Sequence, residues 1–129
     1  VLEVKSQEKQ LSQLWKSAIK NNIKRDHYAA LKDYSKALEI APKNHFLFYN
    51  RGLTYVDLQL LTQAKSDFDK AIKIKSDFGP AYGNRGMVFY ELDKKDKACE
   101  DFKKAADLKY KRAVNWIKDK NRSAWCTQN

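Results

Sequence analysis

The stretch FYNRGLTY at residues 48–55 decides the fold, because a close copy returns 34 residues later inside AYGNRGMVFY at residues 81–90. The Asn-Arg-Gly at residues 50–52 thereby recurs at residues 84–86. Self-similarity at a fixed period marks a repeat architecture. Alignment on this offset divides most of the chain into three units of 34 residues: 11–44, 45–78 and 79–112.

The second half of each unit carries the clearest repeat. The three copies read ALKDYSKALEIAPKN from residue 30, AKSDFDKAIKIKSDF from residue 64 and ACEDFKKAADLKYKR from residue 98. Each copy has an Ala, an aromatic residue four positions later and another Ala three positions after that, which places them on one face of a helix. Phe48, Gly52 and Tyr55 show the same spacing in a first half. Each unit is therefore expected to be two antiparallel helices that bury their apolar faces by stacking.

This pattern resembles the tetratricopeptide repeat (TPR) family, in which helix A and helix B together fill 34 residues. The resemblance covers about 100 of the 129 residues. Units two and three match the family nearly everywhere through repeat position 27, whereas the Pro of position 32 is present only as Pro42. The resemblance implies an all-α fold, a right-handed α-solenoid (superhelix) built from three helix-turn-helix TPR units.

The flanks are expected to extend this single TPR domain over residues 1–129. The first ten residues are polar and compatible with a helix, so we predict that they lengthen the first helix A. Residues 113–126 place Val114, Ile117 and Trp125 on one side with Lys and Arg opposite. That amphipathic pattern predicts a capping helix over the core of the last repeat, and about seven helices in all.

The resemblance also assigns roles to the repeated Asn-Arg-Gly. Its glycines, Gly52 and Gly86, stand at position 8, where helix A must approach helix B closely. Its arginines stand at position 7, and we predict at least one ion pair between Arg51 or Arg85 and the recurrent Asp of helix B, drawn from Asp33, Asp67 and Asp101. The Gly that is frequent at position 15 of the family is replaced in every unit. We therefore expect the turns at Arg25, Gln59 and Asp93 to be either less tight or mildly strained.

In TPR proteins helix A lines a concave groove, which repeat positions 2, 5, 6, 9, 12 and 13 face. In this sequence those positions are unusually apolar for a surface, and exposed clusters rich in aromatic residues and Met mark interaction sites. The resemblance thus implies a non-catalytic scaffold whose groove binds a protein or peptide through Trp15, Ile19, Phe46, Tyr49, Asn50, Leu53, Val56, Asn84, Met87 and Tyr90. The alternative is self-association, in which a second copy or the chain's own terminus fills the groove.

A chaperone-tail adaptor is disfavoured. TPR proteins that grip the C-terminal carboxylate of heat-shock chaperones carry Lys, Asn, Asn, Lys and Arg at five groove positions. Here those positions hold Trp15, Ile19, Asn50, Pro80 and Asn84, so only Asn50 fits. A basic clamp binds a carboxylate by charge-assisted hydrogen bonds. An aromatic slot suits the apolar side chains of a helix or extended peptide instead.

The net charge of +10 also points to acidic partners. The excess lies in residues 1–44, which carry about +4, and in residues 79–129, which carry about +5. We therefore expect acidic flanks on the ligand. Nucleic-acid binding is a weaker alternative, because Asp101, Asp107 and Asp119 interrupt the C-terminal Lys and Arg residues and no recognised motif accompanies them. No apolar run reaches the roughly 18 residues of a membrane span.

Catalysis, a cofactor and a metal are not predicted. The sequence lacks a GxSxG, an HExxH and a phosphate-binding loop. His27 and His45 are isolated and do not stand at metal-ligand spacing from the two cysteines.

Cys99 and Cys126 suggest a disulfide. Cys99 lies near the start of the last helix B and Cys126 near the end of the predicted cap, so antiparallel packing would bring them together. Such a bridge would contribute about 3 kcal/mol in the chain-entropy model and would imply an oxidising compartment such as the bacterial periplasm. The alternative is two free thiols, which suit the cytoplasm.

Overall fold

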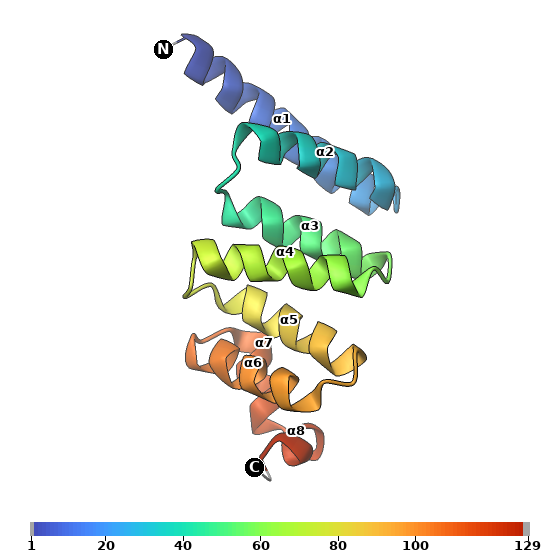
Figure 1. The fold of residues 1–129 in the computed structure, drawn as a ribbon, viewed down its shortest axis with the longest axis vertical. Helices are drawn as coiled ribbons and strands as arrows, with labels where there is room; N and C mark the ends of the chain where they lie inside the picture. Colours follow the sequence, from blue (N-terminus) through green and yellow to red (C-terminus); the bar gives the residue numbers. More distant parts are fainter. Residues whose placement is uncertain (1, 128–129) are drawn as a thin grey trace. The chain divides into compact units, whose positions relative to one another are not determined.

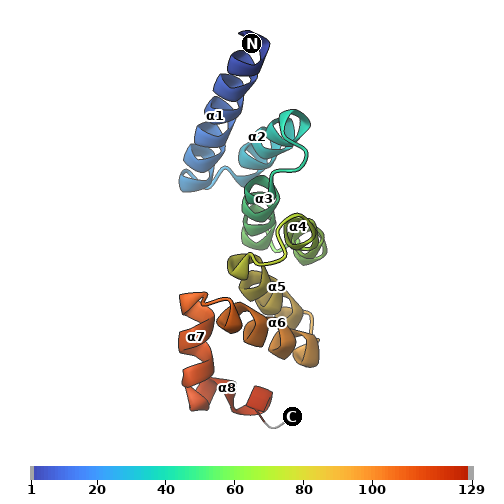
Figure 2. The ribbon, with the colours of Figure 1, turned by 90° about the vertical axis from the view of Figure 1, so that its left-hand side faces the viewer.

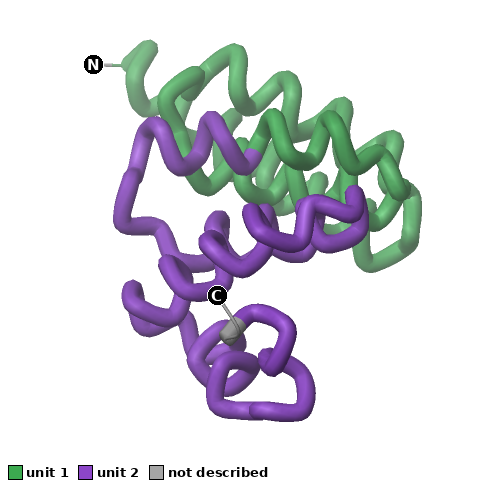
Figure 3. Tube along the Cα trace, turned by 60° about the horizontal axis from the view of Figure 1, so that its bottom comes forward, with its two compact units in different colours: residues 1–67 green, residues 68–129 purple. Residues whose placement is uncertain are grey.

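The structure is a computed structural model that describes residues 2–127, with side chains through Cys126. These residues form eight α-helices and no strand, which confirms the all-α fold class (Figure 1). The chain divides into two compact units, residues 1–67 and residues 68–129, and the boundary falls inside helix α4, Leu61–Ile74 (Figure 3). No helix in the described part of the chain is long and apolar enough to cross a bilayer.

Unit 1 contains three complete helices and the start of α4. The complete helices are α1 (Leu2–Ile23), α2 (His27–Ile40) and α3 (His45–Asp57). One buried cluster joins them, composed of Ala18, Ala30, Tyr34, Ala37, Leu38 and Leu47. The three alanines bring the helix backbones close together, and Tyr34 and the leucines fill the remaining space. The first residues of α1 are exposed and continue the helix beyond the end of α2, as predicted (Figure 1).

Unit 2 contains the remainder of α4 and four further helices. These are α5 (Gly79–Glu91), α6 (Lys95–Asp107), α7 (Lys111–Lys118) and α8 (Lys120–Thr127) (Figure 2). Phe89, Ala98 and Phe102 form a buried cluster, against which Trp116 and Trp125 pack. Helices α7 and α8 thus cover the core of the last repeat, which is the role expected of the cap.

Gly86 explains how α5 packs so closely on α6. A Cβ atom at this position would lie 2.7 Å from the Phe102 ring and 3.2 Å from the Cβ of Asp101. Those separations are shorter than van der Waals contact, so a side chain would push the two helices apart. Gly86 therefore has the close-approach role predicted for repeat position 8.

The turns between helix A and helix B are strained as predicted. Arg25, Gln59 and Asp93 have φ of 64°, 59° and 59°, in the left-handed region that favours glycine. Each turn closes with a hydrogen bond from the next backbone N–H to a carbonyl five residues earlier, as in a Schellman motif. In the second repeat this bond joins Leu60 to Tyr55 at 2.9 Å. These bonds satisfy carbonyls at the end of helix A and hold the unfavourable backbone geometry in place.

The prediction of a single capping helix over residues 113–126 is wrong. This segment forms two helices, α7 and α8, which Asp119 separates. The carboxylate of Asp119 accepts a hydrogen bond from the backbone N–H of Asn121 at 3.1 Å, and its carbonyl accepts one from Ser123. Asp favours such local bonds at the start of a helix, so it ends α7 and begins α8. The fold therefore has eight helices among the described residues instead of about seven.

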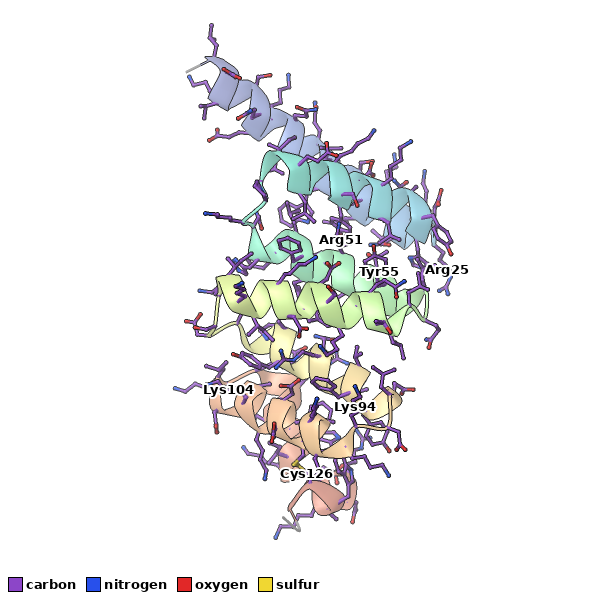
Figure 4. All side chains as sticks on the ribbon, viewed as in Figure 1. Arg25, Arg51, Tyr55, Lys94, Lys104 and Cys126 are labelled. Carbon is purple, nitrogen blue, oxygen red and sulfur yellow. A yellow bond between two sulfur atoms is a disulfide. The ribbon has the colours of Figure 1, made fainter. Side chains whose placement is uncertain are left out.

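A disulfide joins α6 to α8 in the structure. It links Cys99 to Cys126, whose Cα atoms lie 5.4 Å apart, within the range that disulfide geometry requires. Both cysteines are buried (Figure 4 labels Cys126). The bridge closes a loop with a sequence separation of 27 and so holds the end of the chain against helix B of the last repeat.

Candidate functional site

The recurrent arginines are part of the scaffold. In unit 1, Nε and Nη2 of Arg51 each lie 2.8 Å from a carboxylate oxygen of Asp67, and Nη1 lies 3.2 Å from Oγ of Ser35. In unit 2, Arg85 binds Asp101 in the same two-pronged way, with Nη1 3.0 Å from Asp69. The predicted ion pairs are therefore confirmed in both repeats. Each arginine also binds a second residue from the preceding repeat, a contact that was not predicted from the sequence.

Two aromatic rings lie beside each guanidinium group. The Arg85 guanidinium lies 5.5 Å from the centre of the Tyr82 ring and 5.6 Å from that of Phe89. Arg51 and Tyr55 lie one turn apart on α3 (Figure 4), and the Arg51 guanidinium is 5.9 Å from the ring centre of Tyr55. Cation–π contacts of this kind stabilise a cation that has lost part of its water. The arginines therefore hold the helices of the scaffold together and are poor candidates for ligand contacts.

Arg85 and Asp101 each affect the pKa of the other. Hydrogen bonding to Asp101 raises the pKa of the Arg85 guanidinium above its usual value, although burial opposes this change. Burial raises the pKa of the Asp101 carboxyl, and the charge of Arg85 opposes that change. Asp101 thus depends on Arg85 to remain ionised inside the unit.

The first repeat places neutral groups where the others place arginine. Oγ of Ser17 donates to Asp33 at 2.7 Å, and Nδ2 of Asn21 donates to the same carboxylate oxygen at 2.9 Å. Ser17 and Asp33 are 16 residues apart, the same separation as in the two arginine pairs. The helix A to helix B contact through this Asp is therefore common to all three repeats.

Unit 1 brings two of the predicted groove residues together. Trp15 on α1 and Phe46 at the start of α3 line a hollow of about 350 Å³, together with Glu8, Leu11, Ser12, Asn44 and Leu47. Trp15 is 45% exposed and Phe46 is 51% exposed. The other predicted groove residues of unit 1 do not line this hollow: Ile19 is exposed on α1, and Tyr49, Asn50, Leu53 and Val56 are half-buried side chains of α3.

A polar contact fixes α1 against α3 next to these groove residues. Nδ2 of Asn22 donates to Oγ1 of Thr54 at 2.9 Å, and Oδ1 of Asn22 is hydrogen-bonded to Nδ1 of His27 at 2.9 Å. Thr54 is buried. His27 therefore has a structural role, and the described residues contain no group of three potential metal ligands.

Unit 2 contains a larger and more polar hollow, of about 640 Å³, between α5 and α7. We call it the α5–α7 pocket, and it is lined by Gly83, Asn84, Met87, Phe102, Tyr110, Arg112, Ala113, Asn115, Trp116, Asp119 and Arg122. The predicted groove residues Asn84 and Met87 both belong to it. Nδ2 of Asn84 donates to the Pro80 carbonyl at 2.8 Å, so this amide group is already engaged within α5.

Tyr90 differs from the other predicted groove residues of unit 2. Its ring centre lies 5.5 Å from that of Trp125, and Trp125 packs against Trp116 at 5.6 Å. Trp116 in turn lies 4.5 Å from Phe102. Tyr90 therefore forms part of the packing between α5 and the cap, which makes it a weaker candidate for a ligand contact than Met87.

The residues that α7 and α8 contribute to the α5–α7 pocket were not predicted from the sequence. Because α6 ends at Asp107 and only residues 108–110 connect it to α7, α7 begins at Lys111, two residues before the 34-residue period predicts. Lys109 makes this short turn with φ of 64°. Counting repeat positions from Lys111 places positions 2, 5, 6, 9 and 12 at Arg112, Asn115, Trp116, Asp119 and Arg122. All five line the pocket.

Paired helices that repeat every 34 residues, with a shared Arg or Ser to Asp contact, define an α-helical repeat scaffold. The Tetratricopeptide repeat model matches residues 47–78 and 79–116, more than half of the chain. The chain therefore belongs to the TPR family, whose fold is a non-catalytic scaffold for protein interaction. A comparison with curated protein sequences gives no significant match.

Solved structures resemble this chain over most of its length. The first TPR domain of Spaghetti (RPAP3), bound to the HSP90 peptide SRMEEVD, has 23% identity and a TM-score of 0.80, covering 90% of this chain and 94% of that chain. The Arabidopsis OM64 TPR domain has 23% identity and a TM-score of 0.79, covering 84% and 91%. The TPR2B domain of yeast Sti1, in a complex with pHsp70, has 18% identity and a TM-score of 0.72, covering 92% and 91%. At these identities the similarity establishes the fold.

Proposed function

We propose that this TPR protein binds a peptide or a segment of a partner protein on the faces of its A helices. The observation that carries the proposal is the hollow of unit 1, where Trp15 and Phe46 remain about half exposed beside Leu47 of the buried core and Leu11, which packs against it. Exposed aromatic side chains that line a concavity are typical of interaction sites, because covering them removes a large apolar area from water.

The ligand contacts proposed on the two units differ in kind. On unit 1 they are mainly apolar, with Trp15, Ile19 and Phe46 exposed and Tyr49, Asn50, Leu53 and Val56 half-buried. On unit 2 they are Asn84 and Met87, with Tyr90 at the edge of the cap. An apolar helix face or an extended peptide suits the unit 1 surface.

The ligand proposed here differs from the chaperone peptides bound by two of the structural neighbours. At the groove positions that would grip a C-terminal carboxylate, only Asn50 matches the residue that such TPR proteins use. We expect the peptide SRMEEVD to bind no better with a free C-terminal carboxylate than with an amidated one. A clear preference for the free carboxylate would show that the chain has a terminal-carboxylate clamp.

The proposal is tested by selecting short random peptides displayed on phage against the purified protein. Trp15→Ala and Phe46→Ala should each weaken binding of a selected peptide by tenfold or more, because each removes an exposed aromatic contact. Tyr28→Ala is the matched control, since Tyr28 is also an exposed aromatic side chain but lies on α2, a B helix. Circular dichroism would check that all three variants keep their helicity.

Two results would contradict the proposal. One is that the protein selects no peptide at all. The other is that Tyr28→Ala weakens binding as much as Trp15→Ala does. Sedimentation of the unliganded protein tests the alternative of self-association. A dimer that dissociates in Trp15→Ala or Phe46→Ala would show that a second copy covers the hollow of unit 1.

A further inference from the structure

The α5–α7 pocket has a surplus of positive charge that no scaffold contact uses. Its lining includes two guanidinium groups, Arg112 and Arg122, but only one carboxylate, Asp119. Residues 111–122, which form α7 and the start of α8, contain five Lys or Arg residues and one Asp, a net charge of +4.

The single carboxylate of the pocket is already engaged. An oxygen of Asp119 lies 3.3 Å from Nε of Arg122, and the same side chain accepts a hydrogen bond from the Asn121 backbone at the start of α8. Arg112 is exposed, and no ion-pair partner for it exists among the described residues. Arg112 therefore differs from Arg85 of the same unit, which is bound to Asp101 and Asp69.

The floor of the pocket is apolar. Trp116 rests on the buried Phe102 ring, with ring centres 4.5 Å apart, and Met87 is 51% exposed. The ring of Tyr110 fills the space above Gly83, where a Cβ atom would lie 2.7 Å from it. A ligand in this pocket would therefore meet a cation at Arg112 and an apolar surface beside it.

The chemistry of the lining favours a peptide over a phosphate backbone. A planar guanidinium binds a carboxylate through two hydrogen bonds, and the carboxamide of Asn115 can bond a peptide backbone through both its oxygen and its nitrogen. A nucleic-acid backbone is bound by several cations on one surface, whereas Arg122 is already paired with Asp119 and only the Arg112 guanidinium of the lining remains to bind one anionic group.

We propose that the α5–α7 pocket binds an acidic side chain of the peptide ligand. The guanidinium of Arg112 would donate hydrogen bonds to its carboxylate, and Met87 and Trp116 would contact the apolar side chain next to it. This inference rests on the proposed function, since it names the part of the peptide that unit 2 recognises. Arg122 adds positive charge to the pocket but is ion-paired with Asp119. Arg112 is therefore the residue whose loss should matter most.

The same displayed library tests the inference when it is selected in parallel on the unmodified protein, on Arg112→Gln and on Lys104→Gln. Lys104 is exposed on α6 (Figure 4). It does not line the pocket, so Lys104→Gln is a control with the same change in net charge. We expect peptides with Asp or Glu beside an apolar residue from the unmodified protein and from Lys104→Gln. That acidic preference should disappear for Arg112→Gln.

A synthetic peptide then measures the contact directly. Replacing the selected acid by its amide should weaken binding to the unmodified protein by about tenfold, the usual effect of losing one charge-assisted hydrogen-bonded pair. The same replacement should have little effect on Arg112→Gln, because the two changes remove one interaction. Arg122→Gln provides a second variant, for which we expect a smaller loss.

Failure of the inference is distinguishable from failure of the proposed function. If the unmodified protein selects no peptide, both are wrong. If it selects peptides without an acidic preference, or if Arg112→Gln and Lys104→Gln weaken binding equally, only the inference is wrong. It is also wrong if Arg112→Gln abolishes binding of a labelled DNA duplex and leaves peptide selection unchanged.

Discussion

Arg85 on α5 and Asp101 on α6 form a two-pronged ion pair in which Nε and Nη2 each lie 2.8 Å from a carboxylate oxygen. Asp101 is almost completely buried, and Arg85 is the group that compensates its charge within the helix pair. Removing one partner of a buried pair leaves the other charge without compensation. The contact should therefore be much more important for stability than an ion pair on the surface.

We predict that Arg85→Met lowers the free energy of unfolding by about 3 kcal/mol. Urea denaturation followed by circular dichroism would measure this loss. Arg122→Met is the matched control, because Arg122 is exposed and its partner Asp119 is partly exposed, and such surface pairs contribute less than about 1 kcal/mol. Similar small losses in both variants would show that Arg85 is not needed to compensate the charge of Asp101.

The left-handed turn residues offer a stabilising change. Gln59 has φ of 59°, a conformation that costs a non-glycine residue about 1 kcal/mol. Gln59→Gly should therefore raise the free energy of unfolding by roughly 0.5–1 kcal/mol, after allowance for the greater freedom of glycine in the unfolded chain.

Gln13→Gly is the control for this change, because Gln13 is exposed inside the regular helix α1. There the same substitution should destabilise the protein by about 1 kcal/mol. Chemical denaturation of both variants checks the sign of each effect. If Gln59→Gly destabilises the protein as much as Gln13→Gly does, the turn of the second repeat is not strained.

Much of the fold could be predicted because the 34-residue period is visible in several kinds of residue at once. The glycine at position 86, the alanines of helix B and the Arg to Asp pairing all follow from their place in the repeat. These features depend on spacing within one repeat, which a sequence displays directly. The strained turns could also be predicted, since Arg25 and its equivalents occupy a position where glycine is usual.

The features that were missed depend on where the period fails. Lys109 shows no sequence signal for a left-handed conformation, yet its turn shortens the connection to α7 and shifts the register by two residues. In the sequence, Asp119 is one more charged residue of an amphipathic pattern. In the structure it caps α8 and divides the predicted helix in two. Arg112 and Asn115 therefore reach the α5–α7 pocket, although counting by the 34-residue period assigns other residues to that face.

The packing of α5 on α6 provides a third prediction. Gly86→Ala introduces a Cβ atom 2.7 Å from the Phe102 ring, so we expect a loss of roughly 1–3 kcal/mol from overpacking, although alanine is the better helix former. Thermal and urea denaturation would measure it. Phe102→Leu creates space at the same point, and the double variant should lose less than the sum of the two single losses. Simple additivity would show that Gly86 and Phe102 are not in close contact.

The bridge between Cys99 and Cys126 gives the last prediction, which concerns the cap. A disulfide with a sequence separation of 27 restricts the unfolded chain, and its reduction should lower the free energy of unfolding by about 3 kcal/mol. Because Cys126 lies on α8, reduction should also increase amide hydrogen exchange in α8 more than in α5. Mass spectrometry of the intact protein, before and after reduction and alkylation, would establish whether the bridge forms. The variant Cys99→Ser/Cys126→Ser is the control, since its stability should not respond to reductant. Equal stability of the unmodified protein with and without reductant would contradict the prediction.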